Sequence, residues 1–375
     1  MLVYFIPILL IIFSSISISN SEKKKRNIII ALMLFLCFGY MTGSDWRSYE
    51  LYYYDGFLHR LTEPGYMWLS NTCSELGISF WLFHISLKCF SYISILYLIV
   101  KLNKHQGISV ALLLWYASFG LFLFIDCPFR STIACGFASL GFLQLLREDK
   151  KGLILYYGLV LLACLFHTSS VILLIVPLLR FEKIKSVYLV GVYVAIFIIL
   201  LMGGDSLLQS LFNSVFPEQL VDRLDYYMED NQNSLLSPGL IPRFLSIYLL
   251  IRYRSKILDL PYGKFIFNYG YFYLILGLIY YTIPILFRTS LFFAPFYVST
   301  FATATVVMVR RRVYLLKCFV YLLTFILVFT VVRSYKYVPY SNIIPNIITW
   351  SFYDYSYRDL YNPNHTPFND YNRVH

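Results

Sequence analysis

The sequence predicts an all-α fold: a polytopic integral membrane protein with about 12 transmembrane helices and both termini outside the membrane. Hydrophobic residues make up 59% of the 375 residues and charged residues only 14%, and the mean hydropathy is +0.64. So little polar surface is not typical of a soluble domain of this size. Apolar runs of roughly span length also recur from one end of the chain to the other.

The apolar runs define the expected transmembrane helices. The first run, Met1–Ile18, has no basic region before it and no cleavage site of small residues, so we interpret it as a span and not as a secretory signal. The basic stretch "EKKKR" (Glu22–Arg26) follows this run and indicates an outside N-terminus. The expected spans are 2–18, 27–42, 79–100, 107–125, 131–146, 152–166, 168–179, 186–203, 241–251, 264–285, 290–309 and 313–333.

The distribution of basic residues gives the orientation. When sides alternate from an outside N-terminus, about two thirds of the 31 Lys and Arg residues fall in inside loops. An excess of Lys and Arg on the cytoplasmic side is the strongest orientation signal in a membrane sequence. The 12-span topology therefore agrees with the charge pattern.

The stretch Leu161–Val176, "LLACLFHTSSVILLIV", decides the topology of the second half of the chain. If 152–179 were a single helix, the basic groups at 252–256 and 310–312 would lie outside, against the charge rule. We therefore predict two helices with a turn at His167, which lies at the outer face. Both halves are shorter than the ~20 residues of a full crossing. The run at 241–251 is short as well, so a 10-span topology is the alternative.

The expected domain organisation is simple. Residues 1–333 form a single polytopic membrane domain with outer loops at 43–78 and 204–240, and residues 334–375 form an extracytoplasmic tail to which the sequence assigns no role. The seven cysteines show no metal-ligand spacing. Cys73 and Cys127 fall on one expected face, and the sequence leaves open whether they pair.

Four helices that run from outside to inside begin with a basic residue. These residues are Arg130 in "DCPFRSTIA", His167 in "FHTSS", Arg243 in "GLIPRF" and Arg288 in "LFRTSLFFAP". Helix N-termini favour anions, and arginine suits bidentate phosphate recognition. Ser or Thr follows three of the four, as an N-cap or hydroxyl donor. Together they predict a diphosphate site at the membrane surface, although each taken alone also fits an interfacial anchor that binds lipid headgroups.

The first outer loop holds further candidates among many aromatic residues. Asp45 and Glu63 could act as a general base, bind sugar hydroxyls, or pair with an arginine. Tyr49, Tyr66 and Arg47 are candidates for sugar binding, since aromatic faces and polar groups occur together in such sites. An aromatic belt at the membrane interface explains the same composition without any function.

Other chemistry has little support in the sequence. The net charge of +11 lies in short loops between apolar runs and makes no readable patch, so we exclude nucleic acid as a partner. The chain has no Walker A, GxGxxG, HExxH or GxSxG motif, and no metal or other cofactor is expected. A transporter would show charges along a path through the membrane, but Lys88 is the only clear charge within a span.

Six short motifs occur in an order that resembles a known family. They are "SDWRSYELYYY", "EPGYMWL", "FRSTIA", "FHTSSVILL", "FRTSLFF" and "YVPYSN" (Tyr337–Asn342). Their order resembles the EpsG-type family, a branch of the Wzy-like polysaccharide polymerases, and the resemblance covers residues 40–342. It implies a polymerase of bacterial exopolysaccharide, capsule or O-antigen, which needs no cofactor and lies in the cytoplasmic membrane with its active site on the extracytoplasmic face.

The resemblance also implies substrates and roles. The donor is a growing glycan on undecaprenyl diphosphate and the acceptor is a lipid-linked repeat unit; membrane lipids, a flippase and a chain-length regulator of the same pathway are the expected partners. Arg130 and Arg288 would hold the diphosphate, His167 would act as base or hydrogen-bond the reacting groups, and Asp45 and Glu63 would hold or activate the acceptor sugar. Arg243 joins the diphosphate group from the helix-start argument alone.

Two other functional classes remain open at this stage. A glycan ligase shares the same lipid-diphosphate donor, and a membrane acyltransferase that modifies the glycan also uses outer-face Arg and His residues. The second class is a transporter, namely a flippase of lipid-linked oligosaccharide. The sequence does not determine the sugars, the linkage, the stereochemical outcome or the oligomeric state.

Overall fold

The computed structural model describes residues 1–16, 22–55, 63–104, 107–202, 239–280, 283 and 286–352. Helices hold 83% of these residues, and the described part contains no strand beyond an isolated bridge between Gly39 and Asn342. The predicted all-α class is therefore confirmed. Most of the outer loop predicted at 204–240, and the tail beyond 352, lie outside the described residues.

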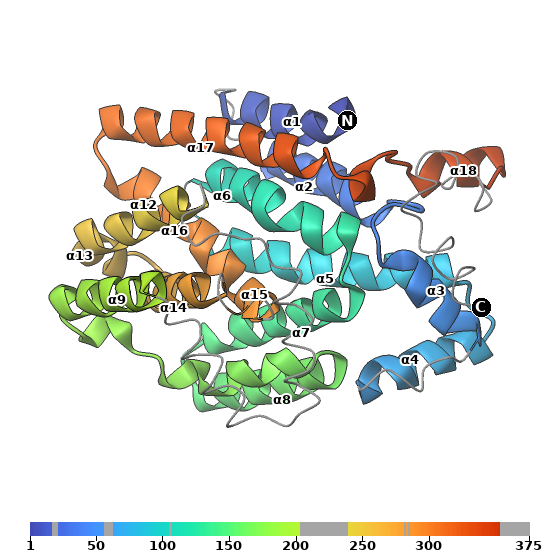
Figure 1. The fold of residues 1–375 in the computed structure, drawn as a ribbon, viewed down its shortest axis with the longest axis horizontal. Coiled ribbons are helices and arrows are strands. Elements are labelled where there is room, and N and C mark those ends of the chain that lie inside the picture. Colours follow the sequence, from blue (N-terminus) through green and yellow to red (C-terminus); the bar gives the residue numbers. More distant parts are fainter. Residues whose placement is uncertain are drawn as a thin grey trace. The chain divides into compact units, whose positions relative to one another are not determined.

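The chain divides into two compact units, whose helices are drawn in Figure 1. The first unit takes the described residues of Met1–Val100, Ser109–Val171 and Tyr314–His375, and the second those of Lys101–Ile108 and Ile172–Val313. The α-helices with most of their residues in the first unit are α1 (Ile6–Ile16), α2 (Glu22–Cys37), α3 (Trp46–Asp55), α4 (Pro64–Glu75), α5 (Phe80–Leu102), α6 (Ile108–Trp115), α7 (Phe129–Leu145), α8 (Lys150–Phe166), α17 (Arg310–Val331) and α18 (Ile343–Thr349). Those of the second unit are α9 (Ser186–Leu201), α12 (Leu240–Arg252), α13 (Arg254–Leu258), α14 (Gly263–Ile279), α15 (Leu286–Ser290) and α16 (Ala294–Val307).

Shorter helical turns connect these elements. Single 3₁₀ segments occur at Leu2–Phe5, Thr168–Leu178, Phe181–Lys183, Leu291–Phe293 and Tyr335–Tyr337, and two π-helical turns, Tyr116–Gly120 and Phe122–Asp126, follow α6. A helical element overlaps each of the 12 predicted spans.

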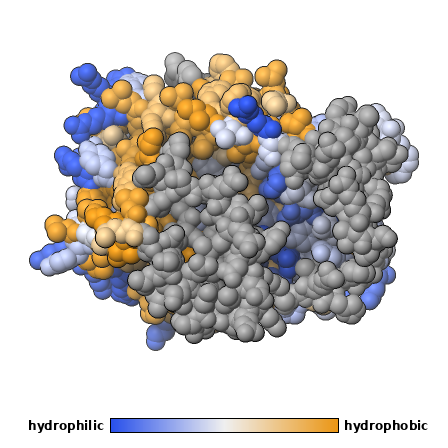
Figure 2. All heavy atoms as spheres, viewed as in Figure 1, coloured by the Kyte–Doolittle hydropathy of each residue, from blue (hydrophilic) through white to orange (hydrophobic). Residues whose placement is uncertain are grey.

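Within the described residues, three helices are long and apolar enough to cross a membrane: Phe80–Leu102, Leu286–Val307 and Arg310–Val331. Shorter apolar helices occur at Leu2–Ser15, Ile108–Gly120, Ser186–Leu201 and Gly263–Ile279. The surface agrees with a membrane environment. Helix α17 (Figure 2) begins with three arginines, and exposed hydrophobic side chains follow them along the helix. The number of spans and the sides of the termini stay predictions.

The predicted break at His167 is present in the structure. Helix α8 ends at Phe166, and His167 follows with an extended backbone (φ −158°, ψ 118°) before the chain resumes as a 3₁₀ helix at Thr168. The start of α8 has a side-chain cap, since Asp149 accepts a hydrogen bond from the Gly152 amide. Residues 152–179 are therefore not one continuous helix.

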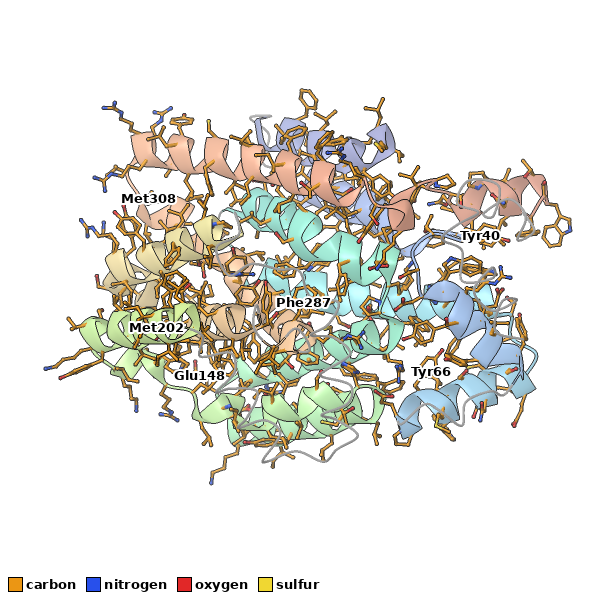
Figure 3. All side chains as sticks on the ribbon, viewed as in Figure 1. Tyr40, Tyr66, Glu148, Met202, Phe287 and Met308 are labelled. Atoms are coloured by element: carbon orange, nitrogen blue, oxygen red, sulfur yellow. The ribbon has the colours of Figure 1, made fainter. Side chains whose placement is uncertain are left out.

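The described part of the C-terminal tail is joined to the end of α2. The Tyr340 hydroxyl donates to the Phe35 carbonyl (2.7 Å), and the Ile343 amide donates to the Phe38 carbonyl (3.0 Å). The Tyr40 amide donates in turn to the Ser341 carbonyl (3.0 Å). Tyr40, labelled in Figure 3, lies in a buried cluster with Met41, Trp46 and Ile343. The tail thereby fixes the entry to the first outer loop.

Candidate functional site

Three of the predicted site residues meet in the first unit. The Glu63 carboxylate pairs with the Arg130 guanidinium through one oxygen, while its other oxygen lies 3.4 Å from His167 Nδ1. Arg130 Nε also donates to the Tyr49 hydroxyl at 3.4 Å. A carboxylate from the first outer loop thus links the start of α7 to the end of α8.

The "EPG" motif explains how Glu63 reaches this position. Glu63 is the N-cap residue of α4, with an extended backbone (φ −93°, ψ 107°), and Pro64 supplies the fixed φ that suits a first helical position. Gly65 then lies against α8, because a Cβ at this position would be 2.8 Å from Leu165 Cβ and 3.0 Å from the Leu165 carbonyl oxygen. The missing side chain lets α4 approach the end of α8, where His167 begins the next segment.

A sharp change of chain direction places Arg130. Cys127 has a left-handed backbone (φ 58°) at the end of the second π-helical turn, and Pro128 is the N-cap residue of α7. Helix α7 therefore begins at Phe129, and Arg130 occupies its first turn. The sequence predicted this helix start correctly.

A group of packed aromatic rings lies beside Arg130. The Tyr66 ring, on α4 where that helix contacts α3, lies 5.6 Å from the Tyr49 ring and 5.9 Å from the Phe129 ring (Figure 3). Tyr66 is fully buried and Tyr49 is 7% exposed, so their rings are packed against protein. Burial raises the pKa of both hydroxyls, although the Arg130 charge opposes the shift at Tyr49. Both tyrosines therefore stay protonated and act as neutral hydrogen-bonding groups.

The site has little contact with solvent but is not closed. The side chains are 6% exposed at Glu63, 10% at His167 and 21% at Arg130. Arginine has five N–H donors, and the contacts with Glu63 and Tyr49 use only some of them. Arg130 thus retains donors for an anionic ligand while its position is fixed by two neighbours.

Two further candidates from the first outer loop lie at the start of α3. Asp45 precedes α3 and accepts the Tyr49 amide through its backbone carbonyl (3.2 Å). Its carboxylate accepts a hydrogen bond from the Ser44 hydroxyl (2.9 Å). Arg47 is 4% exposed, with its guanidinium 5.8 Å from the Trp46 ring centre. Arg47 is therefore packed within the protein.

Arg243 and Arg288 belong to the second unit. Arg243, on α12, is 6% exposed and lies 4.7 Å from the ring centre of Tyr280, beside Gly277 of α14. Arg288 is on α15, and the ring of its neighbour Phe287 lies 5.3 Å from the same Tyr280 ring. The two arginines therefore lie near one end of α14.

Of the two roles predicted for the hydroxyl residues at these helix starts, Thr132 and Ser290 take that of hydroxyl donor. Thr132 donates to the carbonyls of Leu123 (2.9 Å) and Pro128 (3.3 Å), and Ser290 donates to the Phe287 carbonyl (2.7 Å). These hydroxyls satisfy backbone acceptors and do not cap helix N-termini. The same structure leaves Cys73 and Cys127 as free thiols.

Sequence reasoning missed one charged group at the site. Asp126, which directly precedes Cys127, accepts from the Ser44 hydroxyl (2.7 Å) and lies 3.4 Å from the Lys336 ammonium. The aspartate was visible in the "DCPFR" motif, but its partner comes from the tail, 210 positions later in the chain. Within the described residues, no three His, Cys, Asp or Glu side chains are placed to hold a metal ion.

A cation, a carboxylate and an imidazole held at helix ends define an enzyme-like polar site within a bundle of apolar helices. The chain belongs to the EpsG family, whose model matches residues 28–342. This family is associated with polysaccharide-polymerase-like membrane proteins and with glycosyltransferase-like activity. No curated protein and no solved structure matches the chain significantly.

Proposed function

We propose that this protein polymerises a bacterial surface polysaccharide. It transfers a growing glycan from undecaprenyl diphosphate to a lipid-linked repeat unit at the outer face of the cytoplasmic membrane. The observation that carries the proposal is the convergence of Glu63, Arg130 and His167, all within the part of the chain that matches the family model.

The reaction cleaves the bond between the donor sugar and its diphosphate, so negative charge develops on the leaving oxygen. Arg130, at the start of α7, supplies N–H donors and a positive charge to that oxygen, and fixed charges of this kind are often the largest contribution to catalysis. Arg288 and Arg243 have the same role in the proposal, which for them rests on their sequence positions alone.

The acceptor hydroxyl must lose its proton as it attacks the sugar carbon. His167 accepts this proton through Nε2, the ring nitrogen that does not face Glu63, and general-base catalysis of this kind contributes about 10²–10⁴-fold. Glu63 orients the imidazole through Nδ1 and stabilises the imidazolium that forms. No step requires a metal ion or another cofactor.

The length of the surface glycan tests the proposal. The gene is deleted in its native host and complemented with the wild type, Arg130→Ala, His167→Ala or Arg288→Ala, and the polysaccharide is resolved on a gel. Arg147→Ala, at an exposed position beside the start of α8, is the matched control, and membrane levels of every variant are measured.

We expect only single repeat units on the lipid carrier in the deletion strain and with the site variants. Long chains that lack a decoration would instead identify an acyltransferase. Loss of all lipid-linked repeat units from the outer face would indicate a flippase. Long polymer on the carrier that is not transferred onward would indicate a ligase.

A further inference from the structure

A second polar cluster lies beside the first one and is not used by the mechanism above. The Ser44 hydroxyl lies between two carboxylates, 2.9 Å from Asp45 and 2.7 Å from Asp126. The Lys336 ammonium lies 3.4 Å from the other oxygen of Asp126. Ser44 and Asp45 are partly exposed and the Lys336 side chain is 36% exposed, so the rim of this cluster is accessible to a ligand.

A buried ammonium and a buried hydroxyl without a hydrogen-bond partner among the described residues form the inner side of the cluster. Lys88, on α5, is 2% exposed and makes no ion pair with any described residue. The Thr42 hydroxyl is also buried, and within the described residues it has no hydrogen-bond partner. A Cβ on Gly39 would lie 2.8 Å from this hydroxyl and 4.0 Å from the Lys88 ammonium. Both groups therefore border the space that Gly39 leaves open.

The charges of this cluster balance each other. Lys88, Asp45 and Asp126 each interact electrostatically with the Cys127 thiol, so all three lie near the same side chain. Together with Lys336 they make two carboxylates and two ammonium groups. A balanced set of charged donors and acceptors suits a neutral ligand that is rich in hydroxyl groups.

Backbone contacts fix the position of the second cluster, which contains Asp126, next to the first cluster, which contains Arg130. Gly43 has a positive φ (+90°), and a Cβ there would be 2.0 Å from the Ile125 carbonyl oxygen, so only glycine allows this loop to lie against the π-helical turn that ends at Asp126. The Gly43 amide donates to the Lys336 carbonyl (2.9 Å). Asp126 lies four residues before Arg130 in the same connection, so a ligand at the second cluster is adjacent to the first.

We propose that Ser44, Asp45, Asp126 and Lys336 form the subsite for the sugar of the acceptor repeat unit. Carboxylates accept from sugar hydroxyls and the ammonium donates to them, while the Ser44 oxygen can accept, because its single O–H faces the two carboxylates. Lys88 is a positioning residue, because its buried charge compensates the two carboxylates and keeps them available as acceptors. The inference rests on the proposed function. It extends the acceptor site from Asp45, to which the family resemblance already gives this role, to Asp126, Lys336 and Lys88, which lie outside the family motifs.

The test uses membranes that contain the full-length protein and lipid-linked repeat units extracted from the deletion strain. Polymer formation is measured at increasing concentrations of this extract for the wild type, Asp126→Asn, Lys336→Gln and Lys88→Met. We expect the half-saturating concentration to rise about tenfold for Asp126→Asn and Lys336→Gln, with a nearly unchanged maximal rate. Asp259→Asn and Lys150→Gln change exposed residues of the same types and serve as controls.

Binding of the same extract, measured by its effect on the unfolding temperature, separates the two proposals. If the wild type polymerises and the variants keep its half-saturating concentration and its binding, the subsite is refuted and the proposed function stands. If the wild type binds the extract without polymerising it, and Asp126→Asn loses that binding, the function is refuted and the subsite stands. If Asp126→Asn and Lys336→Gln lower the maximal rate and the unfolding temperature without changing the half-saturating concentration, the cluster only holds the tail in place. The subsite is then refuted.

Discussion

Gly65 is the position at which a single methyl group tests the geometry of the site. A Cβ there would be 2.8 Å from Leu165 Cβ and 3.0 Å from the Leu165 carbonyl oxygen. Neither neighbour is the mobile end of a long side chain, because one is a Cβ atom and the other belongs to the backbone. In Gly65→Ala, helix α4 must therefore move away from α8.

The required movement follows from these distances. Carbon atoms pack best at about 3.5–4.0 Å, so α4 must retreat by about 1 Å. Glu63, two residues earlier, moves with the start of the helix, and its contact with His167, now 3.4 Å, is lost. A misplacement of about 1 Å costs up to about 10²-fold in rate. We therefore expect a reduction of about 10- to 100-fold in polymerisation.

The assay is the glycan ladder of the complemented deletion strain, together with the amount of protein in the membrane. Gly158→Ala is the matched control, because Gly158 lies within α8 and a Cβ there meets nothing within 4 Å. This control should polymerise like the wild type, and alanine favours the helix by about 0.5–1 kcal/mol. A full-length ladder from Gly65→Ala at normal protein level would refute the inference that close approach of α4 to α8 sets the site.

The other predictions concern the residues that meet at the cluster. Glu63→Gln keeps the shape of the side chain but removes its charge, so we expect an about 10²-fold lower rate of polymerisation in membranes. Glu63→Ala should lower this rate at least as much. Arg130→Lys retains the charge but cannot hold Glu63 and Tyr49 with one planar group, and we expect at least a tenfold loss; wild-type rates would show that charge alone suffices. Tyr49→Phe removes a hydrogen bond to a charged group and should lower the rate about tenfold. Because burial raises the pKa of Tyr49, its hydroxyl stays protonated from about pH 6 to 9, and the pH profile of Tyr49→Phe should be parallel to that of the wild type.

Much of the fold follows from local sequence patterns. Apolar runs and their polar ends predict a helical element in every expected span, and the polar group "HTSS" predicts the break between α8 and the 3₁₀ helix that follows. Helices α3 and α4 were not predicted, because 43–78 was interpreted only as an outer loop. The start of α7 was readable because Pro128 immediately precedes it and proline fixes φ. These features depend on residues within one or two turns of each other.

The contacts of the site were less predictable because they join distant parts of the chain. Glu63 was a candidate with three open roles, and only the close approach at Gly65 brings it to His167, more than 100 positions later. The pairing of Asp126 with Lys336 depends on the tail returning to the end of α2. The burial of Tyr66 also depends on this packing, since the sequence alone fits an exposed aromatic belt equally well.

The geometry of Glu63 separates two of the roles that the sequence left open. A carboxylate that removes the acceptor proton must present an oxygen to the acceptor hydroxyl, but one oxygen of Glu63 is paired with Arg130 and the other faces His167. Turning the first oxygen toward a substrate would leave the partly buried Arg130 without its counter-charge, which is costly, and turning the second would remove the partner of His167 Nδ1. A carboxylate placed in this way orients its neighbours, as the aspartate of a Ser-His-Asp catalytic triad orients the histidine. We therefore infer that His167 is the base and that Glu63 sets its orientation together with that of Arg130, so that proton removal and leaving-group stabilisation depend on the same carboxylate.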